Sequence, residues 1–232
     1  IQDLIQCFED VSGLPFTGAE FMQWYDVAGR PAVKVTKSYD KTKQQLTLKF
    51  DQTTPSGQAF IMPCTFGLID SKTGKEIEFS ISGASQKSKE HTAVISHDVQ
   101  TVTIDNVPET AIPSLFRGFS AFVSYEANLY EKDLLAIMEF DSDGFNRWDA
   151  AQTLFKEELD KAFTCEMRGD TYKISPKFVK ALKSIGDVSY GMQAALLTMP
   201  SLAEFENGRL RAKPRNPEQV ASAYTAVKKQ LV

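Results

Sequence analysis

Residues 18–36, GAEFMQWYDVAGRPAVKVT, contain the change of period that decides the fold. The apolar residues up to Val27 have helical spacing, and the helix predicted from them ends at Ala28-Gly29 before Pro31. Residues 32–36 then alternate between apolar and polar side chains, which is typical of a strand. The sequence therefore predicts a helical lead-in that gives way to β-structure at this proline.

Another helix is predicted ahead of this stretch, with Leu4, Ile5 and Phe8 on one face and a break at Ser12-Gly13. The chain starts inside this apolar stripe and stops inside another one, at residues 220–231. Because no capping signal accompanies the last stripe, we expect a piece cut from a longer polypeptide. A processed but intact protein is the alternative.

The β region is predicted to continue to about residue 127. Its strands follow the alternation of apolar residues, and turns are predicted at residues 38–41, 53–57 and 70–74. The expected strands are residues 32–36, 46–50, 66–69 and 77–81, one or two short strands around Val94 and Val102, and residues 119–125. Six or seven short strands in about 100 residues predict an antiparallel, immunoglobulin-like β-sandwich.

The rest of the chain, from Tyr130 on, has the period of helices. Asp143 is a predicted N-cap for a helix with one apolar face, made by Trp148, Ala151, Phe155, Leu159 and Phe163. Three later helix starts are indicated by Ser175-Pro176, Ser201-x-x-Glu204 and Asn216-Pro217. Short links between such helices predict a bundle or the first turns of an α-solenoid. The fold class is thus α+β with more than one domain.

Composition excludes several classes of function. The 232 residues are 42% hydrophobic, and 26 basic residues against 30 acidic ones give a net charge of -4. A mildly acidic chain without a basic run predicts no nucleic-acid partner and no membrane contact. The cysteines, Cys7, Cys64 and Cys165, are odd in number and scattered. Free thiols are typical of a reducing compartment, so a cytoplasmic location is expected.

No residue is assigned a catalytic, cofactor-binding or metal-binding role. The two histidines, His91 and His97, are six residues apart in a strand-and-loop region, and we interpret both as surface residues. Residues 141–144, DSDG, imitate the start of a calcium loop but have the glycine in the wrong position, so helix capping is favoured. Phe16, Phe21, Trp24 and Tyr25 are interpreted as a packed core or an interdomain seam. The chain is therefore predicted to be inactive by itself.

Several ordered segments resemble the aminopeptidase N family of zinc metallopeptidases. Residues 21–31, FMQWYDVAGRP, resemble its F-x-x-W-Y-x-x-A-G-x-P segment, and residues 113–121, PSLFRGFSA, resemble P-S-L-L-R-G-F-S-A. Residues 143–152, DGFNRWDAAQ, resemble D-x-F-x-R-W-D/E-A-A-Q, and residues 51–55 with Met62-Pro63 resemble Q-x-T-P and a later I-P. The resemblance covers about residues 1–160. Phe122 departs from it, because the family usually has proline there.

The resemblance implies three domain assignments. Residues 1–30 would be the helical tail of an upstream catalytic domain, residues 31–128 a β-sandwich domain, and residues 129–232 the first part of a helical C-terminal domain. The family's H-E-x-x-H…E zinc site would lie upstream, so zinc is expected in the parent protein and none in this piece. The expected partners are that catalytic domain, in the same chain, and a peptide substrate of the parent, which would remove N-terminal amino acids. A monomer is expected.

Structural roles follow for the matched residues. The chain would brace the catalytic domain and position a helical cap, with Trp24 and Tyr25 as anchors and Trp148 packing a helix onto the sandwich. Arg117 lies among apolar residues and is expected to be buried beside a carboxylate, for which Asp141 or Asp149 is the hypothesis. The alternative from another class is a stand-alone interaction module made of a sandwich and helices, without an enzymatic parent.

Overall fold

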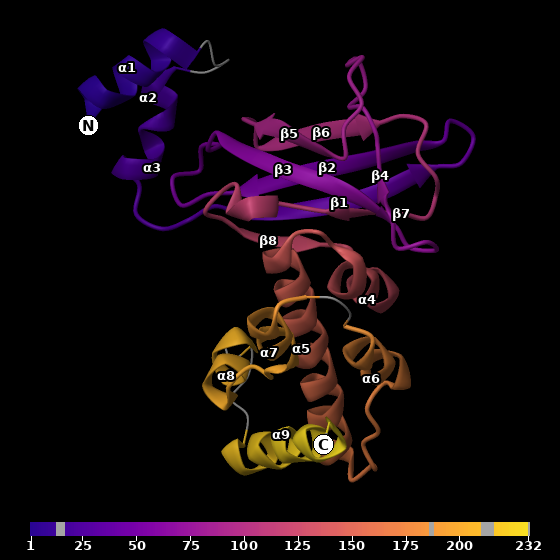
Figure 1. Ribbon diagram of the computed structural model, residues 1–232. Coiled ribbons are helices and arrows are strands. Elements are labelled where there is room, and N and C mark those ends of the chain that lie inside the picture. The colour runs from indigo at the N-terminus through magenta and orange to yellow at the C-terminus, as the bar shows by residue number, and fades with distance from the viewer. Residues whose placement is uncertain (13–16, 186–187, 210–215, 232) are drawn as a thin grey trace. The chain divides into compact units, whose positions relative to one another are not determined.

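The computed structural model describes residues 1–12, 17–185, 188–209 and 216–231 (Figure 1). Contacts within the chain divide it into two compact units, Ile1–Leu129 and Tyr130–Val232. The first unit combines three short helices with a β-sandwich, and the second is helical throughout. This order of helices, strands and helices confirms the predicted fold class.

The lead-in consists of helices α1 (Gln2–Ser12), α2 (Gly18–Phe21) and α3 (Gln23–Asp26). Thr17 and Glu20 form a reciprocal capping box that starts α2. The single helix predicted between Gly18 and Val27 is divided at Met22, whose carbonyl accepts hydrogen bonds from the N–H groups of both Tyr25 and Asp26. Helix α3 ends at Asp26, before the predicted stop at Ala28-Gly29, and Gly29 lies in the loop that follows, with a φ of 107° that favours glycine.

Eight strands form the two sheets of the sandwich. One sheet has the order β6-β2-β1-β8, formed by β6 (Val99–Ile104), β2 (Gln45–Thr53), β1 (Ala32–Asp40) and β8 (Ser124–Ala127). The other is built on β3 (Met62–Asp70), which pairs with β4 (Glu76–Ile77), β5 (Glu90–Ile95) and β7 (Ala111–Ser114). All pairs are antiparallel except β1 with β8, where Ala32 lies opposite Ser124 in parallel register.

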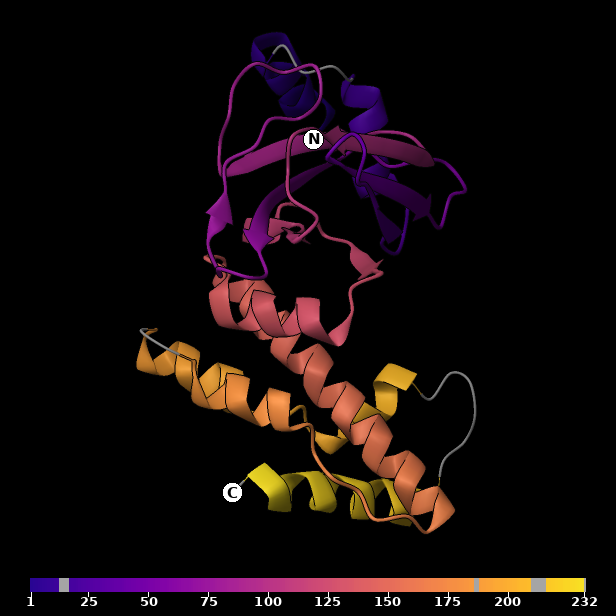
Figure 2. The same ribbon diagram turned by 90° about the vertical axis from the view of Figure 1, so that its right-hand side faces the viewer.

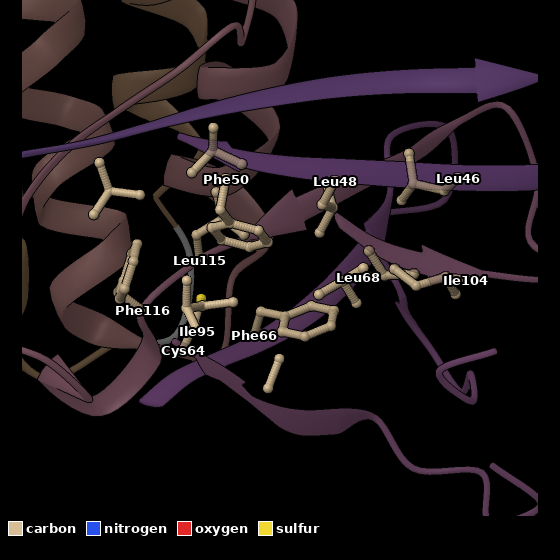
Figure 3. Packing of buried hydrophobic residues seen from close by; sticks show 14 of the residues in the cluster. Leu46, Leu48, Phe50, Cys64, Phe66, Leu68, Ile95, Ile104, Leu115 and Phe116 are labelled. Carbon is tan, nitrogen blue, oxygen red and sulfur yellow. The ribbon is translucent and has the colours of Figure 1, made fainter. Parts of the chain in front are cut away.

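The sandwich core follows from the alternation along its strands. Leu46, Leu48 and Phe50 are fully buried on β2, while the residues between them are less buried. They face Phe66 and Leu68 of β3 across the space between the sheets (Figure 3). Burial of these large side chains is the main stabilising term for the unit.

Three local predictions in this region are wrong. The turn predicted at residues 38–41 is strand up to Asp40, whose carboxylate then accepts from the backbone N–H of Thr42, at 2.9 Å, to start the turn. The strand predicted at residues 77–81 ends at Ile77 and continues only as isolated bridges. In place of the last predicted strand, residues 119–125, the structure has a short 3-10 helix (Arg117–Phe119) followed by β8. Strand β7 was not predicted.

The helical unit is arranged around one long helix. Its elements are α4 (Glu131–Phe140), α5 (Gly144–Arg168), α6 (Pro176–Lys183), α7 (Tyr190–Leu197), α8 (Leu202–Arg209) and α9 (Pro217–Leu231) (Figure 2). Ala151, Phe155 and Leu159 of α5 are buried, which confirms most of its predicted apolar face. Trp148 is 36% exposed, and its predicted packing onto the sandwich stays a prediction.

The predicted helix starts are confirmed by hydrogen bonds. Asp143 accepts from the backbone N–H of Asn146 at 2.8 Å, and Ser175 accepts from that of Phe178. The other caps are the Ser201–Glu204 capping box and Asn216, which accepts from the N–H of Glu218. Each cap satisfies a backbone donor that has no partner inside its helix.

One buried carboxylate holds the connection between α5 and α6. Glu158, on α5, is 2% exposed. It accepts from the Tyr172 hydroxyl at 2.7 Å, from the Ser175 N–H at 3.1 Å and from the Lys161 ammonium at 2.7 Å. Residues 169–175 therefore lie against α5, and Figure 2 shows this segment running back past α9.

The same segment is also fixed from α9. The Gln230 side chain donates to the Tyr172 carbonyl at 3.1 Å and accepts from the Ile174 N–H at 3.0 Å. The amide thus replaces the partners that a neighbouring strand would give to an extended segment. Two polar side chains, Glu158 and Gln230, therefore determine the path of residues 169–175.

Candidate functional site

An apolar stripe on α1 is open to solvent. Ile1, Leu4, Phe8 and Val11 are each more than half exposed, between 54% and 82%. They occur at the three- and four-residue intervals that place side chains on one helix face. Ile5 is the α1 residue that packs inward, and a Cβ at Gly18 would lie 2.7 Å from its Cγ2. This exposed stripe is the strongest candidate for a docking surface in the first unit.

The lead-in is attached to the sandwich through α3. The Trp24 indole N–H donates to the Ile61 carbonyl at 2.8 Å, and its ring meets Phe60 edge-on at 5.0 Å. The sequence interpretation of a packed aromatic cluster is confirmed for Trp24. Tyr25 remains 56% exposed, and Phe16 lies outside the described residues. The lead-in is therefore attached to the β-sandwich through Trp24.

Arg117 is 3% exposed, which confirms its predicted burial. It donates through Nε to Ser114 Oγ and through Nη1 to Glu76 Oε1, both at 2.9 Å, and Glu90 Oε2 lies 3.7 Å away. Its guanidinium fills the space beside Gly67, where a Cβ would overlap it. Arg117 therefore holds the loop after β7 to strands β3, β4 and β5.

The carboxylate partner in this unit, Glu76, was not predicted. It is 41 positions from Arg117 in sequence, and nothing in its local pattern distinguishes it from other exposed acids. The pairing depends on strands that meet only in the folded sheet. Asp141 and Asp149 belong to the helical unit, so their proposed pairing with Arg117 stays a prediction.

The loop that carries Arg117 has an unusual backbone. Phe116, Gly118 and Phe119 have φ values of 52°, 62° and 56°, in the left-handed region. This conformation costs about 1 kcal/mol or more at each non-glycine residue. The burial of Phe116 and the ion pair of Arg117 offset that cost, so the loop depends on its side-chain contacts.

Neither histidine belongs to a group of described side chains that could hold a metal ion. His91 Nε2 is 2.7 Å from the Phe79 carbonyl and its ring packs on the Phe79 ring at 4.7 Å. His97 Nδ1 lies 3.0 Å from Ser96 Oγ in a turn. Residues 141–144 act in helix capping, with Asp141 Oδ1 accepting from the Asp143 N–H. In the part of the chain that the structure describes, no group of three or more His, Cys, Asp or Glu residues could hold a metal ion.

Among the helices described, none combines the length and the apolar character needed to cross a bilayer.

The cysteines differ in environment in a way that labelling can measure. Burial raises the pKa of the Cys64 thiol to about 12, whereas Cys7 is exposed on α1. The thiolate is the reactive form, so Cys64 stays protonated at pH 8. We expect iodoacetamide at pH 8 to modify Cys7 at least about tenfold faster than Cys64, as measured by peptide mass spectrometry. Similar rates at the two residues would contradict the described burial.

Comparisons with known proteins agree with this architecture. A family model described as "Domain of unknown function (DUF3458) Ig-like fold" matches residues 29–128, and one described as "Domain of unknown function (DUF3458_C) ARM repeats" matches residues 131–232. They confirm an immunoglobulin-like sandwich followed by a helical region, and the second description favours the solenoid over the bundle.

Three curated relatives from different bacteria share the name aminopeptidase N. Aminopeptidase N of Escherichia coli K12 is 28% identical over 211 residues, covering 87% of this chain and 24% of that protein. Aminopeptidase N of Haemophilus influenzae is 25% identical over 99% of this chain and 26% of the relative, and that of Caulobacter vibrioides is 30% identical over 68% and 17%. The chain thus spans about a quarter or less of these relatives.

A solved structure is similar over the whole chain. The crystal structure of Legionella pneumophila aminopeptidase A in complex with aspartic acid matches with a TM-score of 0.80 and 25% identity. The match covers 100% of this chain and 25% of that one.

Proposed function

We propose that this chain, which belongs to the aminopeptidase N family, is a non-catalytic portion of a larger zinc-dependent aminopeptidase. In this proposal it braces the catalytic domain through its lead-in and sandwich and positions the helical cap. The parent removes N-terminal amino acids from peptides. The chain acts as a monomer in the cytoplasm, in keeping with its free thiols.

The exposed apolar stripe of α1 is the observation that carries the proposal. A soluble protein seldom leaves a row of large apolar side chains uncovered. The stripe lies on a helix whose other face is fastened to α2, where Glu9 accepts from the Gly18 N–H at 2.8 Å. A catalytic domain packed on the stripe would bury it, and α3 would transmit the contact to the sandwich through Trp24.

The described residues do not fit a zinc ion. Structural and catalytic zinc sites need three or four converging His, Cys, Asp or Glu ligands. No such group is found among them. In this proposal, as the family resemblance implies, the metal is held by the polypeptide upstream, and no catalytic step is derived from the residues present.

The test asks whether the α1 stripe binds the upstream polypeptide. This chain and the polypeptide encoded before it in the same parent protein are expressed separately and mixed. Isothermal titration calorimetry measures their association, and hydrolysis of alanine p-nitroanilide measures aminopeptidase activity. Replacing Leu4 and Phe8 together by aspartate is expected to weaken association at least about tenfold, because burying each side chain contributes about 1.5–3 kcal/mol. Hydrolysis is expected only from samples that contain the upstream protein.

A matched control adds the same two charges to the polar side of α1. Gln2 and Gln6 are both exposed, and their replacement by aspartate is expected to leave association within about threefold of the original. Equal binding by the stripe variant and the control would refute a docking role for the stripe. An upstream sequence without H-E-x-x-H would instead favour the stand-alone interaction module.

A further inference from the structure

Helix α6 carries an exposed row of lysines. Lys177, Lys180 and Lys183 lie on it, and Lys173 precedes it in the segment that leads from α5; we call these four residues the lysine face. All four are exposed, and none has an ion partner in the parts of the chain that the structure describes. No run of basic residues shows this in the sequence, because the lysines are three or four positions apart.

The helix directs these charges to solvent. Phe178, Ala181 and Leu182 are buried on the opposite side of α6. At 100° per residue, Lys177, Lys180 and Lys183 fall within about a third of the helix circumference. Side chains three positions apart on a helix lie about 5–6 Å apart, which is within the Debye length of about 8 Å at physiological salt, so their fields add.

Part of this arrangement lowers the stability of the helix. Lys177 stands in the first turn, where the helix dipole disfavours a cation, and α6 has no acidic residue in that turn, whereas Lys180 and Lys183 stand in the last turn, where the dipole favours a cation. The pairs Lys177–Lys180 and Lys180–Lys183 place like charges at the i,i+3 spacing, which also destabilises a helix. The helix dipole therefore accounts for Lys180 and Lys183 but not for Lys177, and a bound anionic group would offset both the cost at Lys177 and the repulsion between neighbouring lysines.

We propose that the lysine face is a docking surface for an acidic segment of polypeptide. Glutamates at three- or four-residue intervals on such a segment would match the spacing of the lysines, each as a point charge against an ammonium.

Two other polyanions fit less well. A membrane-bound amphipathic helix buries its apolar face in lipid, but that face of α6 is already occupied by the unit's own core. Nucleic-acid surfaces commonly combine basic residues with exposed aromatic or arginine side chains, and the four positions of the lysine face are all lysine.

The test measures binding of a fluorescein-labelled decaglutamate peptide by fluorescence anisotropy. We expect saturable binding at about 50 mM salt that weakens steadily as salt is raised to about 200 mM. Replacing Lys177, Lys180 and Lys183 by glutamate is expected to weaken the binding at least about tenfold. Replacing the same residues by glutamine removes their charge and is expected to give an intermediate loss of decaglutamate affinity. If charge reversal unfolds the helix, the glutamine variant alone tests the proposal.

The control makes an equal change of charge elsewhere. Lys34, Lys72 and Lys87 are exposed lysines of the sandwich unit, and their joint replacement by glutamate is expected to change decaglutamate affinity less than about threefold. Equal losses for the two triple variants would overturn the proposal, because net charge alone would then explain binding. Binding of vesicles rich in phosphatidylserine, or of a ten-nucleotide RNA, more tightly than decaglutamate would overturn it as well.

Discussion

Replacing Gly67 by alanine is expected to lower the free energy of unfolding of the sandwich unit by about 3 kcal/mol, the upper range for overpacking a core. The reason is the guanidinium of Arg117, which occupies the place that the new methyl group would take. Arg117 cannot simply turn away, because it is 3% exposed and is bound to Glu76 and Ser114.

Replacing Arg117 by alanine is expected to cost a similar amount. Removing one member of a buried ion pair costs about 3–5 kcal/mol, and the lower end applies because Glu76 is 21% exposed and keeps some hydration. The double variant, with alanine at both positions, is expected to lose clearly less than the sum of the two single changes, because the methyl group then enters the space that the guanidinium has left.

Urea unfolding followed by tryptophan fluorescence can measure this cycle. Trp148 is changed to phenylalanine in every variant, so that Trp24 alone reports on the sandwich unit. Gly191→Ala, on α7 of the helical unit, serves as a control for the glycine-to-alanine change outside the sandwich, since a Cβ there meets nothing within 4 Å and Trp24 is expected to report no change. It is expected to be neutral or slightly stabilising. If the losses in free energy of unfolding at Gly67 and Arg117 were additive, the two residues would not share the space described. If the Arg117→Ala protein unfolded at the same urea concentration as the original, the ion pair would be dispensable for stability.

Replacing Glu158 by alanine is the second large effect, and it concerns the helical unit. Three donors lose a charged acceptor: the buried Tyr172 hydroxyl, the Ser175 N–H and the Lys161 ammonium. Lys161 is half exposed and can turn to water, whereas the Tyr172 hydroxyl is left without its partner. Hydrogen bonds to charged groups contribute about 1.5–3 kcal/mol each, so we expect a loss of about 3 kcal/mol.

Helical circular dichroism at 222 nm during urea unfolding measures the loss, because the helical unit supplies most of that signal. Glu166→Ala removes the same charge from an exposed position of α5 and is expected to change stability by less than about 0.5 kcal/mol. Hydrogen exchange of residues 169–175 is expected to speed up in the Glu158 variant alone. Equal stability of the two variants would show that Glu158 does not hold this segment.

Local signals in the sequence were sufficient for much of the fold. The caps at Asp143, Ser175 and Ser201 depend on residues three positions apart, and each was predicted correctly. The strand β7 was missed because all four of its residues are buried and Pro113 interrupts it, so no alternation is visible.

Contacts made between distant strands could not be predicted. The burial of Arg117 follows from its apolar neighbours, but the pairing with Glu76 requires the register of β3, β4 and β7. Glu158 lies in a run of charged residues, LysGluGluLeuAspLys, where composition indicates a solvated face. A helical wheel would have placed it beside Phe155 and Leu159 on the buried side.

The parallel pairing of β1 with β8 has a consequence for the order of events during synthesis. The first strand of the sandwich is completed by its last one, through contacts such as that of the Ser124 N–H with the Pro31 carbonyl at 3.0 Å. About eighty residues must leave the ribosome between the end of β1 at Asp40 and the start of β8 at Ser124, so until then the outer edge of β1 offers unpaired backbone groups to other chains. A nascent polypeptide that stalls before Ser124 is therefore exposed to aggregation at β1, and chaperone binding at that stage would protect it.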